Sequence, residues 1–125
     1  MVSYPIGDFL IRIKNAGLAR KKEVSVSASK KLEAVAKAMK AAGFLNEVVN
    51  KEGTITVQLT YHRKEPVILG LELVSKPGRR IYISADELAE RKGPEVLIVS
   101  TSKGVLPQKE AIKERVGGEV VAKVW

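Results

Sequence analysis

The spacing of apolar residues in the first half of the chain predicts two helices and three strands. Apolar positions three and four apart predict helices over residues 3–18 and from Ser29, as the N-cap, to Gly43. Alternation of apolar and polar residues predicts strands over 23–27, 44–49 and 54–61, the last two joined by a turn at 50–53. This order predicts a small sheet with both helices on one face.

The second half is predicted to be mostly strand, with short helical connections. Apolar runs predict strands over 67–74, 79–83, 95–99 and 120–125. Residues 84–87 have the sequence of a capping box, and Pro107 opens a predicted helix over 107–115. The stretch Ser75-Lys76-Pro77-Gly78 fits a type II turn with Pro77 at position i+1 and Gly78 at i+2, and residues 116–119 fit a tight turn.

Together these elements predict an α+β fold of two small packed domains. Residues 1–66 form an α/β layer, and residues 67–125 form a β-rich domain with short helices. The polar segment 62–66, which ends at Pro66, marks the boundary. It is too short for a flexible linker, so the two parts are expected to pack together.

Composition narrows the function classes. The chain has 125 residues, 45% hydrophobic and 29% charged, which is globular. It has no apolar run of about 18 residues and no signal-peptide pattern, so neither a membrane span nor a signal peptide is expected. The chain is predicted to have no membrane partner. The absence of Cys rules out disulfides and thiolate chemistry and fits a cytosolic location. With a single His, His62, no zinc site and no cofactor are expected.

Charge points toward a polyanionic partner. The formal net charge is +8 and the sequence pI is about 9.8, values typical of a nucleic-acid-binding domain. Residues 1–64 hold 12 basic and 5 acidic side chains, whereas residues 65–125 hold 10 and 9. Long-range attraction is therefore expected mainly from the first half. An anionic membrane surface and DNA remain the competing partners on charge alone.

The segment Val99–Val105 carries the strongest candidate chemistry. Three hydroxyl side chains, a cation and a glycine follow a buried strand: Ser100, Thr101, Ser102, Lys103 and Gly104. The shallow minor groove of RNA presents 2′-hydroxyls and base edges within reach of short Ser and Thr side chains, and Lys103 can meet a phosphate. Aromatic residues are only 5% of the chain, so recognition by shape and hydroxyls is favoured over base stacking. The simpler interpretation is an ordinary polar turn between strands.

Other motifs are weaker. Ser100 to Lys103 matches the S-x-x-K pattern of serine hydrolases that recognise penicillin, but that motif needs a helix, and its partner signatures are absent. No P-loop, helix-turn-helix or zinc-finger pattern occurs. The chain is therefore not expected to be an enzyme.

Four blocks resemble the bacterial small-subunit ribosomal protein eight family. They are Leu10–Asn15 (LIRIKN), Val74–Tyr82 (VSKPGRRIY), Val99–Val105 (VSTSKGV) and Val116–Glu119 (VGGE). The match covers nearly the whole chain, in order and with the family's spacing. The resemblance implies a cytoplasmic, ribosomal protein, monomeric outside the ribosome, that binds the central domain of 16S rRNA early in assembly and supports neighbouring proteins. It also implies that an mRNA hairpin of its own operon, mimicking the rRNA site, can be bound to repress translation.

The resemblance also suggests which residues contact rRNA. The principal loop is Ser100, Thr101, Ser102, Lys103 and Gly104, with Gly117, Gly118 and Glu119 packed beside it. A second basic hairpin contributes Lys76, Arg79, Arg80 and Tyr82. In the first half the implied phosphate and sugar contacts are Arg12, Lys14, Asn15, Ser27, Ser29 and Lys30.

Three positions depart from the family's pattern. Ser27 or Ala28 replaces a usual proline before the second helix. Gly93-Pro94-Glu95 replaces a Gly-rich lead into the central strand. Leu106-Pro107-Gln108 stands where a Thr-Asp type of helix cap is usual.

Overall fold

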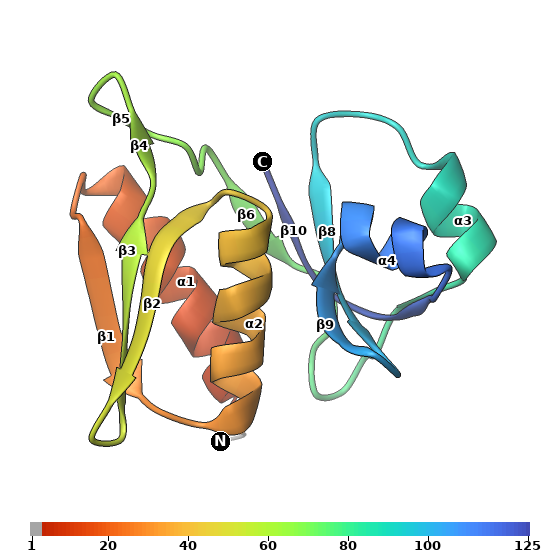
Figure 1. Ribbon diagram of the computed structural model, residues 1–125, viewed down its shortest axis with the longest axis horizontal. Coiled ribbons are helices and arrows are strands. Elements are labelled where there is room, and N and C mark those ends of the chain that lie inside the picture. Colours follow the sequence, from red (N-terminus) through yellow and green to blue (C-terminus); the bar gives the residue numbers. More distant parts are fainter. Residues whose placement is uncertain (1–3) are drawn as a thin grey trace.

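In the N-terminal half, two helices cover one face of an antiparallel sheet (Figure 1). The structure is a computed structural model and describes residues 4–125. The strand order is β1-β3-β2. The elements are α1 (Pro5–Leu18), β1 (Glu23–Ser27), α2 (Lys30–Ala41), β2 (Leu45–Lys51) and β3 (Thr54–Leu59). This arrangement confirms the predicted layer, although the predicted start of α1 at Ser3 lies outside the described residues.

Local sequence explains where these elements begin and end. The apolar stripe of α1, which includes Phe9, Leu10 and Ile13, is buried, and each such side chain contributes about 1.5–3 kcal/mol. The Ser29 hydroxyl accepts a hydrogen bond from the backbone N–H of Leu32 at 3.1 Å and caps α2 as predicted. The hairpin turn is shorter than predicted, since β2 continues through Asn50 and Lys51.

The C-terminal half is built around β10 (Gly118–Val124). It pairs with β6 (Leu71–Leu73) and β7 (Tyr82–Ile83) on one side and with β8 (Val96–Thr101) on the other. The outer strand β9 (Gly104–Pro107) pairs with β8. Helices α3 (Ala85–Glu90) and α4 (Gln108–Glu114) complete this half, and α3 begins with the predicted capping box. The α+β class is confirmed.

Several predicted strands are shorter in the structure. Only Leu71–Leu73 of the predicted strand 67–74 is a strand, because the backbone N–H groups of Leu69 and Gly70 donate instead to the carbonyl of Trp125. Tyr82–Ile83 is the strand part of 79–83, since the Ile81 N–H donates to the Ser75 hydroxyl.

Turns and an added strand also differ from prediction. The type II turn is wrong, since Gly78 lacks the positive φ that this turn requires. The strand β9 was not predicted, because Gly104 and Pro107 bound only two apolar residues.

Between the halves, Tyr61–His62 (β4) and Glu65–Pro66 (β5) form a short hairpin where only a polar loop was expected. Its two-residue turn is Arg63-Lys64. Figure 1 shows this hairpin projecting at the upper left of the molecule.

The two halves share a hydrophobic core. The larger cluster joins α1, α2 and the first sheet to one face of the second sheet, through residues such as Ile98, Ala122 and Val124. A smaller cluster lies under α3 and α4 on the opposite face of the second sheet and contains Leu88, Leu97, Val99, Ala111 and Val120. The division into domains at residue 66 stays a prediction.

Candidate nucleic-acid interface

Strand pairing brings three of the predicted contact residues into one row. Glu119 of β10 lies opposite Tyr82 of β7 and opposite Ser100 of β8. Side chains of directly paired antiparallel residues project from the same face of a sheet, so the three form a continuous polar row. Tyr82 is 70% exposed. Segments 18 to 37 residues apart in the chain thus meet at one surface.

Gly117 and Gly118 make this row possible by allowing backbone to approach backbone. A Cβ on Gly118 would overlap with the carbonyl oxygen of Ser100, and a Cβ on Gly117 would lie 2.8 Å from the backbone nitrogen of Ala85. The predicted tight turn at 116–119 is wrong in detail, because Gly118 and Glu119 already belong to β10. The chain reverses instead at Arg115, the C-cap of α4, which has φ of 57°.

The hydroxyl cluster lies at the turn between β8 and β9. The Thr101 hydroxyl donates to the carbonyl of Gly104 at 2.7 Å and accepts from the N–H of Lys103 at 3.0 Å. Gly104 has φ of 105°, which explains the glycine. Within residues 4–125, the hydroxyls of Ser100 and Ser102 make no hydrogen bond. The turn therefore uses Thr101 for its own stability and leaves Ser100 and Ser102 available.

Lys103 is paired with an acidic residue of α4. Its ammonium lies 3.2 Å from Oε2 of Glu114, and both side chains are about half exposed. Nothing in the sequence singled out Glu114. The strand and turn also exclude the helical geometry that an S-x-x-K hydrolase site requires, because Ser100 lies on β8 and Lys103 in the turn.

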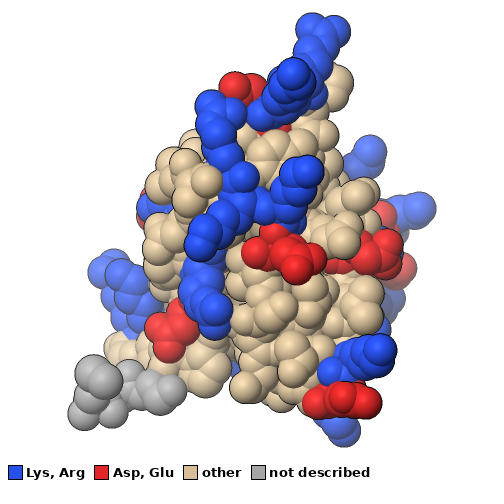
Figure 2. All heavy atoms as spheres, turned by 90° about the vertical axis from the view of Figure 1, so that its left-hand side faces the viewer, with Lys and Arg blue, Asp and Glu red and all other residues tan. Residues whose placement is uncertain are grey.

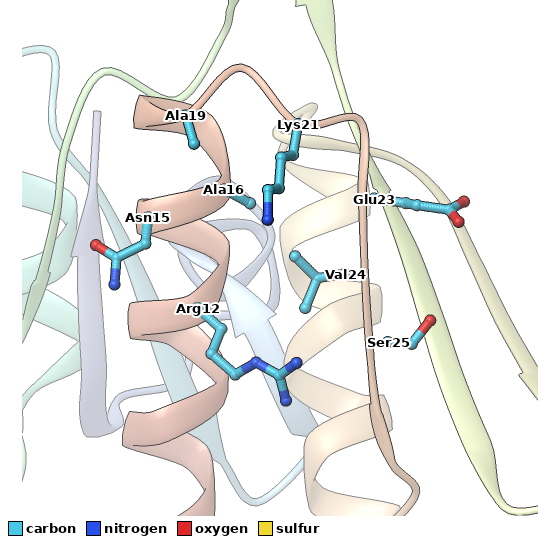
Figure 3. A pocket seen from close by; sticks show the side chains of 8 residues that line it. All are labelled: Arg12, Asn15, Ala16, Ala19, Lys21, Glu23, Val24 and Ser25. Atoms are coloured by element: carbon cyan, nitrogen blue, oxygen red, sulfur yellow. The ribbon is translucent and has the colours of Figure 1, made fainter.

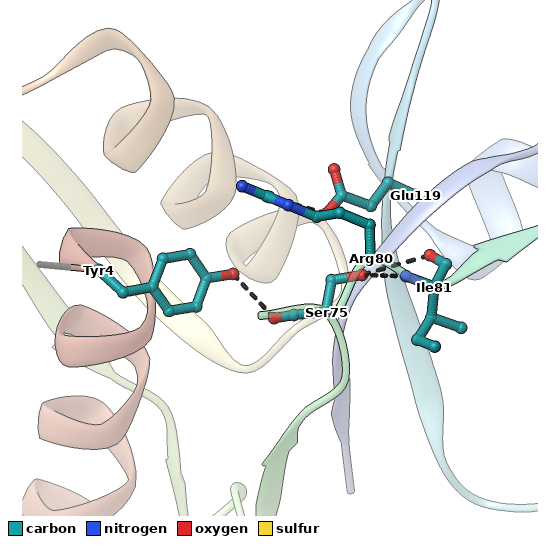
Figure 4. A network of polar contacts seen from close by, with 5 residues as sticks. All are labelled: Tyr4, Ser75, Arg80, Ile81 and Glu119. Atoms are coloured by element: carbon teal, nitrogen blue, oxygen red, sulfur yellow. Dashed lines mark hydrogen bonds and ion pairs between the residues drawn. The ribbon is translucent and has the colours of Figure 1, made fainter. Parts of the chain in front are cut away.

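A polar network connects the row to the start of α1 (Figure 4). Arg80 donates from Nη1 to Oε2 of Glu119 at 3.0 Å, and this bond together with the carboxylate charge raises the pKa of Arg80. The Tyr4 hydroxyl donates to the carbonyl of Ser75 at 2.9 Å. Burial raises the pKa of Tyr4; Arg80 lowers it by a smaller amount and Glu119 adds to the increase.

Ser75 is a buried residue of this network that the sequence analysis did not identify. Its hydroxyl donates to the carbonyl of Ile81 and accepts from the N–H of Ile81. Lys76 and Arg79 flank the adjoining turn, where their backbones exchange two hydrogen bonds of 2.9 Å and their side chains are exposed.

Three of the six predicted contacts of the first half lie along the groove between α1 and β1: Arg12, Asn15 and Ser27. Arg12 and Asn15 line a hollow of about 420 Å³ with Lys21 and Ser25. Figure 3 shows the Arg12 and Lys21 side chains extending into the space between the helix and the strand.

The other predicted residues of the first half do not line this hollow. Arg12 also lines the adjoining hollow with Ser27. Lys14 lines neither hollow and is half-buried, while Ser29 caps α2 and Lys30 is exposed. The sequence grouped Lys14 with Arg12, but the helix turns by about 200° over two residues and separates them.

Basic side chains gather on the face of the first half. Figure 2 shows them in a nearly continuous column on the side of the molecule that is at the left in Figure 1, interrupted by a few acidic residues. Of the described residues, no helix is both long and apolar enough to cross a bilayer. The described part of the chain therefore has a polar row on its C-terminal half and a surface rich in Lys and Arg on its N-terminal half.

Comparison with known proteins identifies the family. The model of the family described as Ribosomal protein S8 matches residues 4–125. The chain belongs to the ribosomal protein S8 family. This family is a structural component of the ribosome and not a family of enzymes, and the predicted location on the cytoplasmic ribosome agrees with the membership.

Curated relatives of the S8 family cover all or nearly all of the chain. Small ribosomal subunit protein uS8 of Nitratidesulfovibrio vulgaris strain DP4 is 44% identical over 126 residues, covering all of both chains. That of Persephonella marina is 43% identical over 136 residues, again covering both chains completely. That of Leuconostoc mesenteroides is 45% identical over 127 residues, with 97% of this chain and 96% of the relative covered.

Proposed function

We propose that this S8 protein binds the central domain of 16S rRNA directly, as a primary binder early in small-subunit assembly, and helps to organise the platform. The observation that carries the proposal is the polar surface formed by Tyr82, Glu119, Ser100 and the β8–β9 turn. The membership of its relatives in the small ribosomal subunit supports rRNA as the ligand.

The chemistry of this surface suits structured RNA. Ser100 and Ser102 offer hydroxyls that both donate and accept, which matches 2′-hydroxyls and base edges of a shallow minor groove. Glu119 repels phosphates but accepts hydrogen bonds from base amino groups, so it favours bases in a defined register. Arg80, which is paired with Glu119, supplies a cation beside the row, and Lys103 supplies one at the β8–β9 turn.

The remaining predicted contacts supply attraction rather than specificity. Arg12, Asn15 and Ser27 along the α1–β1 groove are suited to phosphates and sugars, because their charged and polar groups are exposed to any approaching RNA backbone. The net charge of the first half steers the protein toward RNA, and the polar surface then fixes the register.

The proposal also includes repression of the protein's own translation, through the same surface. A protein that recognises RNA by shape and hydroxyl groups binds a messenger hairpin of the same shape, so its own operon mRNA would compete with rRNA. We further propose that the chain is monomeric when free and contacts neighbouring small-subunit proteins once on the rRNA.

Binding to a central-domain rRNA fragment over a range of salt concentrations tests the proposal. The affinity is expected to fall steeply with salt, with excess duplex DNA or anionic vesicles competing poorly. A salt-independent affinity, or equal competition by DNA or vesicles, would rule out specific rRNA recognition.

A further inference from the structure

Ser75 closes the exposed loop of residues 76–80, which leads into β7. Within residues 4–125 it is the only buried residue with a polar or charged side chain, and its exposed fraction is 0%. Its hydroxyl donates to the carbonyl of Ile81 at 3.2 Å and accepts from the N–H of Ile81 at 3.0 Å (Figure 4). One side chain therefore bonds both backbone groups of Ile81 and joins the two ends of the loop.

This pair of bonds lies where β10 changes neighbours along one of its edges. β10 pairs with β6 through Ala122–Val124 and with β7 through Gly118 and Glu119. Between these stretches, the Val120 carbonyl accepts from the N–H of Ser75 at 3.2 Å, and the Val120 N–H donates to the Ile81 carbonyl at 2.8 Å. Hydrogen bonds thus join Ser75, Ile81 and Val120 in a closed ring, which fixes both ends of the loop on β10.

The neighbours of this ring along the chain belong to the candidate RNA interface. Arg80 and Tyr82 flank Ile81. Glu119 directly precedes Val120. Arg80 bonds to Glu119 at 3.0 Å, and Tyr82 lies opposite Glu119 in the strand pairing. A shift of Ile81 away from Val120 would therefore move Arg80 and Tyr82 relative to Glu119.

Packing alone does not explain a serine at this buried position. Burial of a hydroxyl costs free energy unless the hydroxyl is hydrogen-bonded, whereas the methyl group of an alanine carries no such cost. Without the Ser75 hydroxyl, however, the N–H of Ile81 has no acceptor among the described residues. A hydroxyl both donates and accepts, so it serves the N–H and the carbonyl of Ile81 at once.

We propose that Ser75 is a positioning residue for RNA recognition, which acts through the Ile81 backbone to hold Tyr82 in place on the interface. Arg80, on the other side of Ile81, is held in the same way. The Ser75 hydroxyl is buried and does not itself touch RNA. The inference rests on the proposed function, because it assumes that Tyr82 contacts the rRNA.

A double-mutant cycle with a central-domain rRNA fragment tests this role. Ser75→Ala is expected to lower the affinity about tenfold, because the freed loop has to be ordered during binding. Tyr82→Ala is expected to lower the affinity of the wild type about tenfold. Its effect is expected to be smaller by a factor of about three or more in the Ser75→Ala background, since coupled residues are not additive. Lys103→Ala, in the β8–β9 turn, is expected to have the same effect in both backgrounds.

Tyr4→Phe is the matched control for a general loss of stability. It removes the 2.9 Å hydrogen bond to the Ser75 carbonyl but leaves both bonds between the Ser75 hydroxyl and Ile81. Urea unfolding is expected to show lower stability for Tyr4→Phe and for Ser75→Ala. In the Tyr4→Phe background, however, Tyr82→Ala is expected to keep its full effect on affinity. If Ser75→Ala does not fold, Ser75→Cys replaces it, because a thiol keeps the shape and bonds only weakly.

Three results would overturn the inference. They are equal affinities of the wild type and Ser75→Ala, additive effects of Ser75→Ala and Tyr82→Ala, and an equal reduction of the Tyr82→Ala effect in the Tyr4→Phe background. A different result would overturn the proposed function itself and the inference with it. That result is a wild type that does not bind the fragment, or one whose affinity Tyr82→Ala and Lys103→Ala both leave unchanged.

Discussion

Gly118 lies against the backbone of Ser100 so closely that a Cβ at position 118 would overlap with the Ser100 carbonyl oxygen. This contact sets the distance between β10 and β8, and therefore the position of Glu119 relative to Ser100. The polar row of Tyr82, Glu119 and Ser100 thus depends on a residue that has no side chain of its own.

Replacing Gly118 with Ala is expected to destabilise the protein by about 2–3 kcal/mol, because the new methyl group must displace β8. Urea unfolding measures the change. Gly78→Ala is the matched control, since a Cβ there meets nothing within 4 Å and φ is not positive; its effect is expected to stay within about 0.5 kcal/mol. Equal effects at the two glycines would contradict the close-packing explanation.

Neighbouring hydroxyls of the β8–β9 turn are expected to respond differently to deletion. Ser102→Ala is expected to weaken rRNA binding by about 1–3 kcal/mol with unchanged stability, because this hydroxyl is not used within the described structure. Thr101→Val is expected to lower stability by about 1 kcal/mol, since it removes both bonds that close the turn. Paired binding and unfolding measurements distinguish the two effects. If Ser102→Ala changed the binding free energy by less than about 0.5 kcal/mol, the segment would be an ordinary polar turn between strands.

Glu114 is expected to compete with RNA for Lys103. When Lys103 leaves Glu114 for a phosphate, the freed carboxylate attracts a cation, so Lys103→Ala is expected to lower the salt slope by less than the value of about 1 for an unpaired lysine. Glu114→Gln is expected to strengthen binding about two- to fivefold. Glu110→Gln, which removes the same charge one helical turn away, provides the control. Weaker binding by Glu114→Gln would instead mean that Glu114 positions Lys103.

The capping box of α3 predicts a pH dependence of stability. The Ser84 N–H donates to Oε1 of Glu87 at 3.1 Å, and the Ser84 backbone and hydroxyl lower the pKa of Glu87 below its usual 4.5. A carboxyl with a lowered folded-state pKa contributes stability above its unfolded pKa and loses it as the pH falls through the folded value. The stability advantage of the wild type over Glu87→Gln is therefore expected to shrink as the pH falls below 4.5. Urea unfolding at a series of pH values measures this. A difference in unfolding free energy between the wild type and Glu87→Gln that stayed constant below pH 4.5 would contradict the explanation.

Elements with local signals could be predicted from the sequence. The stripes of α1 and α2, the Ser29 cap and the Ser84–Glu87 capping box depend on neighbours within a few residues, and all appear as expected. The strands at 67–74 and 79–83 could not be bounded in this way, because their limits depend on bonds to Trp125 and Ser75 from elsewhere in the chain.

In the candidate site, too, features set by neighbouring residues could be predicted and features set by distant residues could not. Ser100 to Gly104 stood out as a motif, but the row that joins Ser100 to Glu119 and Tyr82 depends on long-range strand order. The pairing of Lys103 with Glu114 and the meeting of Arg20 with Lys64 likewise link positions whose spacing has no local signature.

Directed hydroxyl-radical probing from position 102 tests the central claim most directly. The chain contains no Cys, so Ser102→Cys gives a single attachment point for an iron chelate, and Lys92→Cys gives a matched exposed control. With the tethered proteins bound to naked small-subunit rRNA, the Ser102 probe is expected to cleave a compact set of central-domain nucleotides that the Lys92 probe does not cleave. Cleavage no stronger than that of the control, or cleavage scattered outside the central domain, would contradict recognition of rRNA by the β8–β9 turn.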